Sequence, residues 1–268
     1  MTMFSFLLTV LLLGTPPVTA STGLPLHSHN DYWRTRPLLD ALAAGCISIE
    51  ADVFAVDGSL AVAHDRKDIR EGKTLRSMYL EPLAELVRAR GRVYPEDPQP
   101  LYLVIDLKSG WGETAPVLRK VFKEYGDILH APAGSWEGEG GVIVVTSGAG
   151  AGQGRIKDGV AAVDGRPSDL GRDIDAAVMP IVSTSYLGRL RRPKVEGRVV
   201  PLHEELKALC DQARAEGKLF RLWAAPDIPV GWDMLTEIGV GLINTDRPAA
   251  ASGHLRAKAK QRQATDEE

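Results

Sequence analysis

The sequence has few cysteines and no excess of basic residues. Its two cysteines, Cys46 and Cys210, lie far apart in a chain of 268 residues. We therefore favour two buried thiols over a disulfide, although an exported protein could hold them paired. The formal net charge is -3 and no basic stripe stands out, which argues against a nucleic-acid partner.

The amino end lacks a hydrophobic run long enough to cross a bilayer comfortably. Residues 1–20 hold one short apolar run, from Phe4 to Leu13, followed by Gly, Pro and then Val18-Thr19-Ala20. This pattern predicts a secretory signal that is cut after Ala20, and hence a secreted or periplasmic protein. A retained membrane anchor is the alternative. No lysine or arginine precedes the run.

The rest of the chain alternates between strand and helix patterns. Its length suits one large α/β barrel, and 44% of the residues are hydrophobic, enough for a sizeable core. Apolar runs predict strands, and amphipathic runs predict helices at 36–44, 74–90, 113–125, 202–216 and 232–238. The count reaches roughly eight strands, as a closed (β/α)8 TIM barrel needs.

The predicted organisation has one irregular region and a polar end. Residues 148–159 are too rich in glycine for a good helix and too irregular for a phosphate-binding fingerprint. We therefore expect an irregular barrel there. The predicted divisions are a signal peptide at 1–20, one barrel domain at 21–250 and a polar, solvated tail at 251–268.

Two carboxylates lie on one face of the strand CISIEADVF. Because a strand sends alternate side chains to opposite faces, Glu50 and Asp52 point the same way. Two ionised carboxylates in an apolar strand repel each other, so they need a cation, a basic partner or a shared proton. Hard oxygen ligands suit Mg²⁺ or Ca²⁺. The plain alternative is the polar face of an exposed edge strand.

Histidines flank this acidic pair in the sequence. The turn Asp57-Gly58 folds the next run back, so that His64 should come close to the pair. Upstream, an apolar run ends in His27, His29 and Asn30, the layout of a strand that finishes in a polar loop. Two histidines that converge on a carboxylate pair indicate a catalytic site more than a structural one.

A later buried strand, LYLVIDLKS, ends in a similar pattern. Asp106 and Lys108 are two residues apart and share a face. Taken alone, they indicate an internal salt bridge.

These motifs resemble the superfamily of glycerophosphodiester phosphodiesterases and phosphatidylinositol-specific phospholipases C. The resemblance rests on GCISIEADV at 45–53 and on the DG turn that leads to His64-Asp65. HSHNDY, RPLLDAL and IEADV are more narrowly similar to the branch that includes proteins named for altered inheritance of mitochondria. The HRG and ENT motifs that usually mark the phosphodiesterases are absent, which leaves open whether His27 or His29 takes the first catalytic role.

The resemblance implies a phosphoric diester hydrolase that uses one divalent cation, Mg²⁺ or Ca²⁺. It places metal ligands at Glu50, Asp52 and Asp106, general acid and base at His29 and His64, and Lys108 at the phosphoryl oxygens. Substrate-side positions would be His27, Asn30, Trp223 and Asp246. The implied substrate is a glycerophosphodiester or phospholipid-like diester, with peripheral contact with membrane lipid, and a neighbouring substrate hydroxyl can serve as the attacking oxygen.

Two other functions fit parts of the sequence. His27-Ser28-His29 also resembles the HxH motif of amidohydrolase-type metal enzymes, with Asp246 on the last strand as a further match. That chemistry needs more imidazole ligands from middle strands, whereas His130, His203 and His254 lie elsewhere. The other alternative is a non-catalytic barrel that binds a phosphorylated lipid or sugar.

Overall fold

The computed structural model describes most of the chain. The described residues are 22–130, 141–148, 158–190, 194–195, 198–199 and 201–266. The predicted signal peptide at 1–20, and residues 149–157 of the predicted irregular region, lie outside them.

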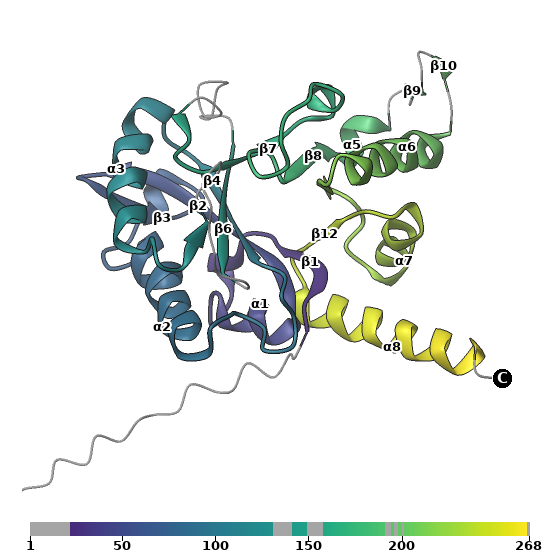
Figure 1. Ribbon diagram of the computed structural model, residues 1–268, viewed down its shortest axis with the longest axis horizontal. Coiled ribbons are helices and arrows are strands. Elements are labelled where there is room, and N and C mark those ends of the chain that lie inside the picture. Colours follow the sequence, from purple (N-terminus) through teal and green to yellow (C-terminus); the bar gives the residue numbers. More distant parts are fainter. Residues whose placement is uncertain are drawn as a thin grey trace, which may run out of the picture.

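Eight strands in the described part close into a parallel barrel, which confirms the predicted fold (Figure 1). Around the ring they are β1 (Leu24–Ser28), β12 (Leu242–Thr245), β11 (Leu219–Trp223), β8 (Ile181–Ser185), β7 (Ala162–Gly165), β6 (Val142–Ser147), β4 (Leu101–Leu107) and β2 (Cys46–Val56). The pairing of β1 with β2 closes the ring.

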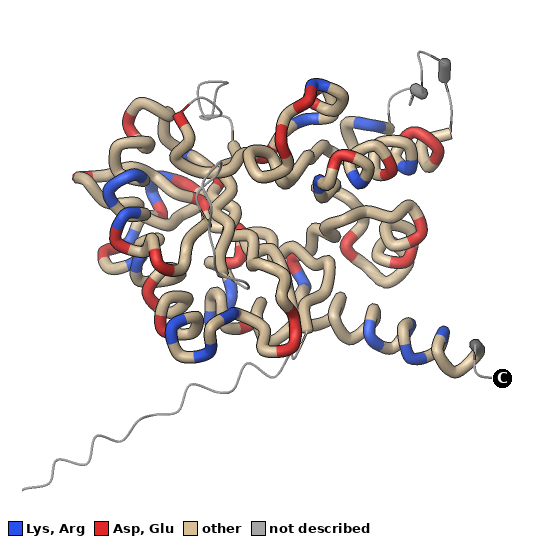
Figure 2. The backbone as a smooth tube through the Cα atoms, viewed as in Figure 1, with Lys and Arg blue, Asp and Glu red and all other residues tan. Residues whose placement is uncertain are grey.

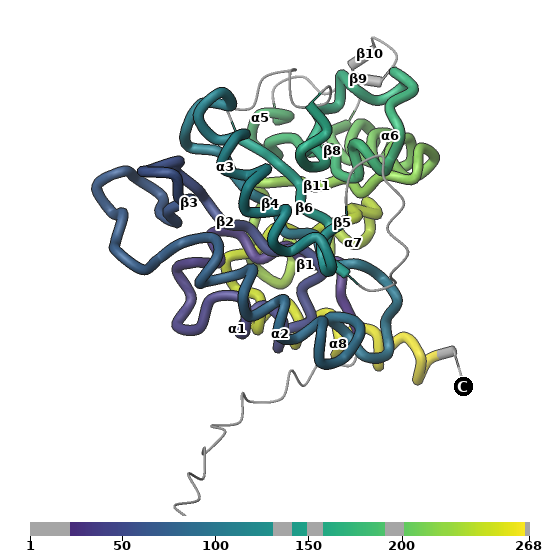
Figure 3. Tube along the Cα trace, turned by 60° about the vertical axis from the view of Figure 1, so that its left-hand side comes forward, coloured from purple at the N-terminus to yellow at the C-terminus, as the bar shows by residue number. Residues whose placement is uncertain are grey.

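Other strands in the described part lie outside this ring. β3 (Ser59–Val62) pairs antiparallel with β2, and Figure 3 shows this hairpin reaching outward from the barrel. β5 (Leu129–His130) adds to β6, while β9 (Lys194–Val195) and β10 (Arg198–Val199) form a separate hairpin.

Helices follow most strands. They are α1 (Leu39–Ala44), α2 (Glu81–Arg90), α3 (Trp111–Glu124), α5 (Tyr186–Arg189), α6 (Leu202–Ala215), α7 (Pro229–Ile238) and α8 (Pro248–Asp266). The five predicted helices, α1, α2, α3, α6 and α7, lie close to their predicted positions. α1 begins later than predicted because Leu38 has a φ of 65°, which a right-handed helix does not allow. Residues 76–80 before α2 form a π-helical turn.

The connection between β7 and β8 contains no α-helix among its residues 166–180, all of which are described. Its one helical element is the 3₁₀ turn Pro167–Asp169. Most of the segment 148–159, where the sequence predicted an irregularity, lies outside the described residues.

The stretch predicted as a solvated tail is largely helical. α8 begins at Pro248, a residue type suited to a first helical turn, and continues through strong helix formers such as Ala, Lys, Arg and Gln. Ala251 is fully buried and Leu255 packs against the core, so the first turns of α8 are part of the barrel wall. Figure 2 shows basic residues along the rest of α8, with both charge signs interspersed elsewhere.

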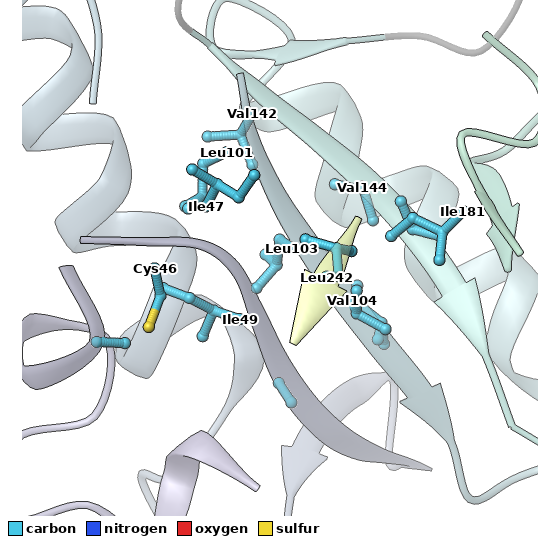
Figure 4. Close-up of a cluster of buried hydrophobic side chains, with 14 of the residues drawn as sticks. Cys46, Ile47, Ile49, Leu101, Leu103, Val104, Val142, Val144, Ile181 and Leu242 are labelled. Atoms are coloured by element: carbon cyan, nitrogen blue, oxygen red, sulfur yellow. The ribbon is translucent and has the colours of Figure 1, made fainter. Parts of the chain in front are cut away.

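The core fills the barrel and the space beneath its helices. Figure 4 shows apolar side chains from neighbouring strands meeting there, with Ile49 of β2, Leu103 of β4 and Leu242 of β12 among them. Cys46 and Cys210 are both buried and both free. In the described residues, no helix combines the length and the apolar character that spanning a bilayer requires.

Candidate active site

The barrel register places the predicted acidic residues at one end. Asp52 of β2 lies opposite Asp106 of β4, and the backbone amide of His29 donates to the carbonyl of Thr245, the last residue of β12. Because parallel strands run the same way, these positions share the carboxyl-terminal mouth of the barrel, where enzymes of this fold place their sites.

The loop after β1 is held by a buried aspartate. Asp31 is fully buried and accepts hydrogen bonds from the Ser28 hydroxyl at 2.8 Å, the Leu38 amide at 2.6 Å and the Tyr79 hydroxyl at 3.1 Å. Burial nevertheless raises the pKa of Asp31. These bonds fix the segment that carries His29 and Tyr32.

Asp52 organises one half of the site. Its Oδ2 atom lies 3.0 Å from Nδ1 of His64, 2.8 Å from the Tyr32 hydroxyl and 2.9 Å from Nζ of Lys108. Burial raises the pKa of Asp52 despite the hydrogen bonds from Lys108 and Tyr32. The carboxylate orients His64, whose side chain is 46% exposed and so remains open to a substrate.

Lys108 bridges Asp52 and Asp106, two of the predicted metal ligands. Its ammonium lies 2.6 Å from Oδ2 of Asp106 as well as 2.9 Å from Asp52, so the internal salt bridge considered from the sequence is present. Burial alone lowers the pKa of Lys108, but the two carboxylates outweigh burial and raise it. Lys108 is therefore a fixed positive charge at the mouth.

Glu50 organises the other half. Its Oε2 atom lies 3.6 Å from Nε2 of His29, and Nδ1 of His29 lies 2.8 Å from Asp246. Burial alone raises the pKa of Glu50, but the charge of Arg221, whose Nη1 atom lies 3.9 Å away, helps to hold it well below its ordinary value. His29 is thus held between two carboxylates, with its side chain 32% exposed.

His27 lies behind the site, where a substrate does not reach it. The ring is fully buried, Nε2 accepts from Arg221 at 2.7 Å, and Nδ1 lies 2.7 Å from the Ser48 hydroxyl. Burial and the Arg221 charge lower the pKa of His27 to about 4, so the ring is neutral. The structure corrects the prediction that His27 contacts substrate, and the nitrogen that a zinc-binding HxH motif would use is engaged by Arg221.

A buried charge cluster inside the barrel was not predicted. Nη2 of Arg221 lies 3.3 Å from Asp164, which also accepts hydrogen bonds from Ser147 at 2.8 Å and Ser183 at 2.7 Å. Nη1 of Arg221 lies 3.9 Å from Glu50, so this cluster supports the acidic site from below. The signal in the sequence was one charged residue in each of two apolar runs, VAAVDG and LFRLW.

Asn30, Trp223 and Asp246 were predicted to contact substrate. Asn30 is 6% exposed, its backbone amide lies 3.3 Å from Oε2 of Glu50, and its side-chain oxygen lies 2.7 Å from the Tyr32 hydroxyl. Asn30 therefore supports the site from within. Trp223 is 42% exposed at the end of β11, and Asp246 is open at the mouth as the partner of His29.

A cavity of about 290 Å³ opens beside His64. Tyr32, Trp33 and Met78 are among the side chains that line it, and charged residues of the loop after β3 complete its rim. The Trp33 ring lies 5.4 Å from the His64 ring. The cavity is therefore positioned to hold a substituent of a group that reacts at His64.

The acidic residues can be tested as ligands of the divalent cation that the resemblance implies. Within the described ranges, no group of three or more His, Cys, Asp or Glu side chains is arranged to hold a metal ion. The donor chemistry nevertheless fits, since Glu50, Asp52 and Asp106 offer the hard oxygen ligands that Mg²⁺ and Ca²⁺ prefer. A positive charge, the Lys108 ammonium, already lies between two of them.

Gly148 adjoins this site, and its replacement by alanine should disturb it. The residue has a φ of 90°, and a Cβ atom would lie 2.6 Å from Oδ1 of Asp106 and 2.8 Å from the Leu107 amide. We expect Gly148→Ala to lower the free energy of unfolding by about 1–3 kcal/mol, as measured by urea denaturation. Gly112→Ala is the control, because nothing lies near its Cβ position. Equal stability of the two variants would contradict the close contact of residue 148 with Asp106 and Leu107.

Comparisons with known proteins identify the family of the chain. The family described as "AIM6-like phosphodiesterase domain" matches residues 18–152. The chain is 30% identical to the altered inheritance of mitochondria protein 6 homolog of Arthroderma benhamiae, over 87% of this chain and 84% of the relative. It is 28% identical to altered inheritance of mitochondria protein 6 of Eremothecium gossypii, over 85% of this chain and 68% of the relative.

A solved structure shares the fold. The glycerophosphodiester phosphodiesterase of Parabacteroides distasonis superposes with a TM-score of 0.53 and 17% identity, over 89% of this chain and 98% of that one. At this identity the likeness concerns the barrel alone.

Proposed function

The chain belongs to the family of AIM6-like phosphodiesterases, and from that premise we propose that it hydrolyses a glycerophosphodiester or phospholipid-like diester by general acid-base catalysis. The observation that carries the proposal is that two partly exposed imidazoles, His29 and His64, are each oriented by a carboxylate. Nδ1 of His29 lies 2.8 Å from Asp246, and Nδ1 of His64 lies 3.0 Å from Asp52.

The two histidines divide the proton transfers between them. His29 removes the proton from the attacking oxygen, which is either water or a neighbouring hydroxyl of the substrate. His64 borders the cavity of about 290 Å³, and it donates a proton to the leaving oxygen of the substituent held there. Imidazole suits both tasks because it exchanges protons near neutral pH, and each transfer typically contributes ~10²–10⁴-fold.

Lys108 and the acidic residues set the charge of the site. The Lys108 ammonium faces the non-bridging oxygens of the phosphate and stabilises the negative charge that grows in the transition state. Glu50, Asp52 and Asp106 would hold the divalent cation, which supplies further neutralisation of the phosphate. Tyr32 and Asn30 hold Asp52 and Glu50 in place through hydrogen bonds, and these carboxylates in turn orient the two imidazoles.

A panel of substrates tests the proposal. We expect the chain from residue 21 onward to release alcohol from glycerophosphodiesters, lysophospholipids or inositol phospholipids, and to leave phosphate monoesters and amides intact. A chelator should lower the rate, and added Mg²⁺ or Ca²⁺ should restore it. Failure to cleave any diester with either cation present would refute the proposal.

Replacement of Glu50 by glutamine should weaken cation binding. The change removes one negative charge from the ligand set and keeps the shape of the side chain. We expect the affinity for Mg²⁺ or Ca²⁺ to fall by about tenfold or more, since loss of even an outer-shell partner typically costs that much. Calorimetric titration measures it, with Glu237→Gln on the exposed face of α7 as the control. Undiminished affinity would remove Glu50 from the ligand set.

A further inference from the structure

Two separate loops carry the members of the pair formed by His29 and Asp246. His29 follows β1 and Asp246 follows β12, and the ladder between these strands ends with Ser28 opposite Thr245. The amide of His29 still donates to the Thr245 carbonyl at 3.0 Å. Beyond this bond the two backbones leave the sheet, and the Asp246 side chain is 57% exposed. Strand pairing and burial alone therefore do not fix the carboxylate against the imidazole.

The side chain of Arg34 bridges the two loops at this point. Its Nη1 atom donates to the backbone carbonyl of Asp246 at 2.5 Å, and its Nη2 atom donates to the backbone carbonyl of His29 at 3.1 Å. A guanidinium is planar and holds its donors in a rigid fork. The two bonds therefore set the separation of the two backbones from which the imidazole and the carboxylate project.

The loop after β1 fixes the position of Arg34. Asn30 has a φ of 47°, which turns the chain directly after His29. The amide of Arg34 donates to the Asp31 carbonyl at 2.9 Å, and Asp31 is fully buried. The guanidinium thus projects from an anchored turn, and it can impose its geometry on the loop after β12.

Asp227 holds Asp246 from the other side. The amide of Asp246 donates to Oδ2 of Asp227 at 2.9 Å, and Nε1 of Trp232 donates to Oδ1 of Asp227 at 2.8 Å. The backbone of Asp246 is therefore held through its amide by Asp227 and through its carbonyl by Arg34. Of these two contacts, the one with Arg34 also reaches His29.

We propose that Arg34 is a positioning residue for general-base catalysis, because it holds the backbones of His29 and Asp246 at the separation that keeps their side chains paired at 2.8 Å. The inference rests on the proposed hydrolysis, in which His29 takes the proton from the attacking oxygen. Both bonds of the guanidinium go to backbone carbonyls, so Arg34 acts through the pair and not on the substrate. Its loss should lower kcat and leave KM nearly unchanged.

Kinetics on the water-soluble diester that the unchanged protein cleaves test this role. We expect Arg34→Ala to lower kcat by about 10–100-fold, the usual cost of losing a residue that orients a functional group. Arg34→Lys should recover little, because one ammonium does not reproduce the fork. Arg36→Ala is the matched control, since Arg36 pairs with Asp40 on α1, and its kcat should stay unchanged. Arg34→Gln replaces the alanine variant if that variant does not fold.

A small guanidinium ion should substitute for the lost side chain. A cavity of about 640 Å³ is lined by Arg34, Arg36 and Asp246 among others, so a solute can approach the two carbonyls from outside. Millimolar methylguanidinium should raise the kcat of Arg34→Ala, whereas methylammonium should not, and neither ion should change Arg36→Ala. Equal effects of the two ions on Arg34→Ala would overturn the bridging role.

Combined variants separate positioning from a general loss of structure. Because Arg34 acts through His29, Arg34→Ala should cost little further activity when it is added to His29→Ala. Added to His64→Ala, it should cost its full factor. A residue that only supports the fold would cost the same factor in both combinations. That result, or an unchanged kcat in Arg34→Ala, would overturn the inference.

Nuclear magnetic resonance of the histidine rings needs no substrate, and so it separates this inference from the proposed hydrolysis. In Arg34→Ala, the ring nitrogen signals of His29 should move toward their positions in Asp246→Asn, while those of His64 stay in place. If the His29 signals do not move, or if the His64 signals move as far, Arg34 does not position the pair. If they move as expected and the unchanged protein cleaves no diester, positioning of the pair stands and hydrolysis falls.

Discussion

Replacement of His64 by alanine is expected to lower turnover of an alkyl phosphodiester by about 10²–10⁴-fold, the usual contribution of one positioned proton donor. The residue faces the cavity of about 290 Å³, and its Nδ1 atom is held 3.0 Å from the Asp52 carboxylate. The other ring nitrogen can then deliver a proton to the leaving oxygen. Because the side chain is 46% exposed, its loss should leave the fold intact.

Comparison of two leaving groups distinguishes whether His64 donates a proton or only supports the structure. A p-nitrophenyl diester needs little protonation of its leaving oxygen, so His64→Ala should be much less impaired on that substrate than on the alkyl one. His203→Ala, which changes an exposed histidine at the start of α6, should match the unchanged protein on both. An equal loss on both substrates would show that His64 is not the acid.

Replacement of Arg221 by methionine is expected to lower the free energy of unfolding by about 3–5 kcal/mol, the typical cost of leaving a buried charge without its partner. Arg221 is 4% exposed, and its guanidinium lies 3.3 Å from Asp164 and 3.9 Å from Glu50. Methionine fills a similar volume, but it removes the guanidinium that contacts both Asp164 and Glu50, so each of these buried carboxylates loses one charged contact. Chemical denaturation followed by circular dichroism measures the loss.

The matched control is Arg214→Met on α6. Arg214 pairs with Asp211 on the protein surface, where water solvates both charges, and its loss should leave stability nearly unchanged. If Arg221→Met were as stable as this control, the buried cluster would have no energetic role. Arg221→Lys should recover part of the stability, because it restores the charge without the planar group that contacts both His27 and Asp164.

The acidic pair could be predicted because strand geometry is local. Glu50 and Asp52 share a face through the two-residue period of β2, and the turn at Asp57-Gly58 returned the chain to His64. The order of strands and helices followed from the same periodicities. These features depend on neighbours in the sequence, so the residues themselves specify them.

The choice between His27 and His29 depended on backbone geometry that the sequence did not display. Two residues apart, they would share a face in an unbroken strand. β1 ends at Ser28, and Asn30 adopts a φ of 47°, so His29 turns toward the mouth while His27 stays inside the barrel. A turn that ends the strand therefore decides which histidine remains accessible.

The cluster around Arg221 could not be predicted from the sequence for a different reason. Asp164 and Arg221 lie on β7 and β11, which are separated by β8, and their meeting requires the register of all three strands. The stretch predicted as a polar tail forms most of α8, whose outer turns are polar and mostly exposed. What fixes it is the packing of Ala251 and Leu255 at its start.

The position of β1 between β2 and β12 also affects how the chain acquires its fold. Strands that meet across nearly the full length of a polypeptide close a large loop, which slows folding. Because the amide of His29 pairs with the carbonyl of Thr245, an emerging polypeptide still lacking its last strand cannot complete this junction. The barrel ring can therefore close only once residues 242–245 are available to pair with β1.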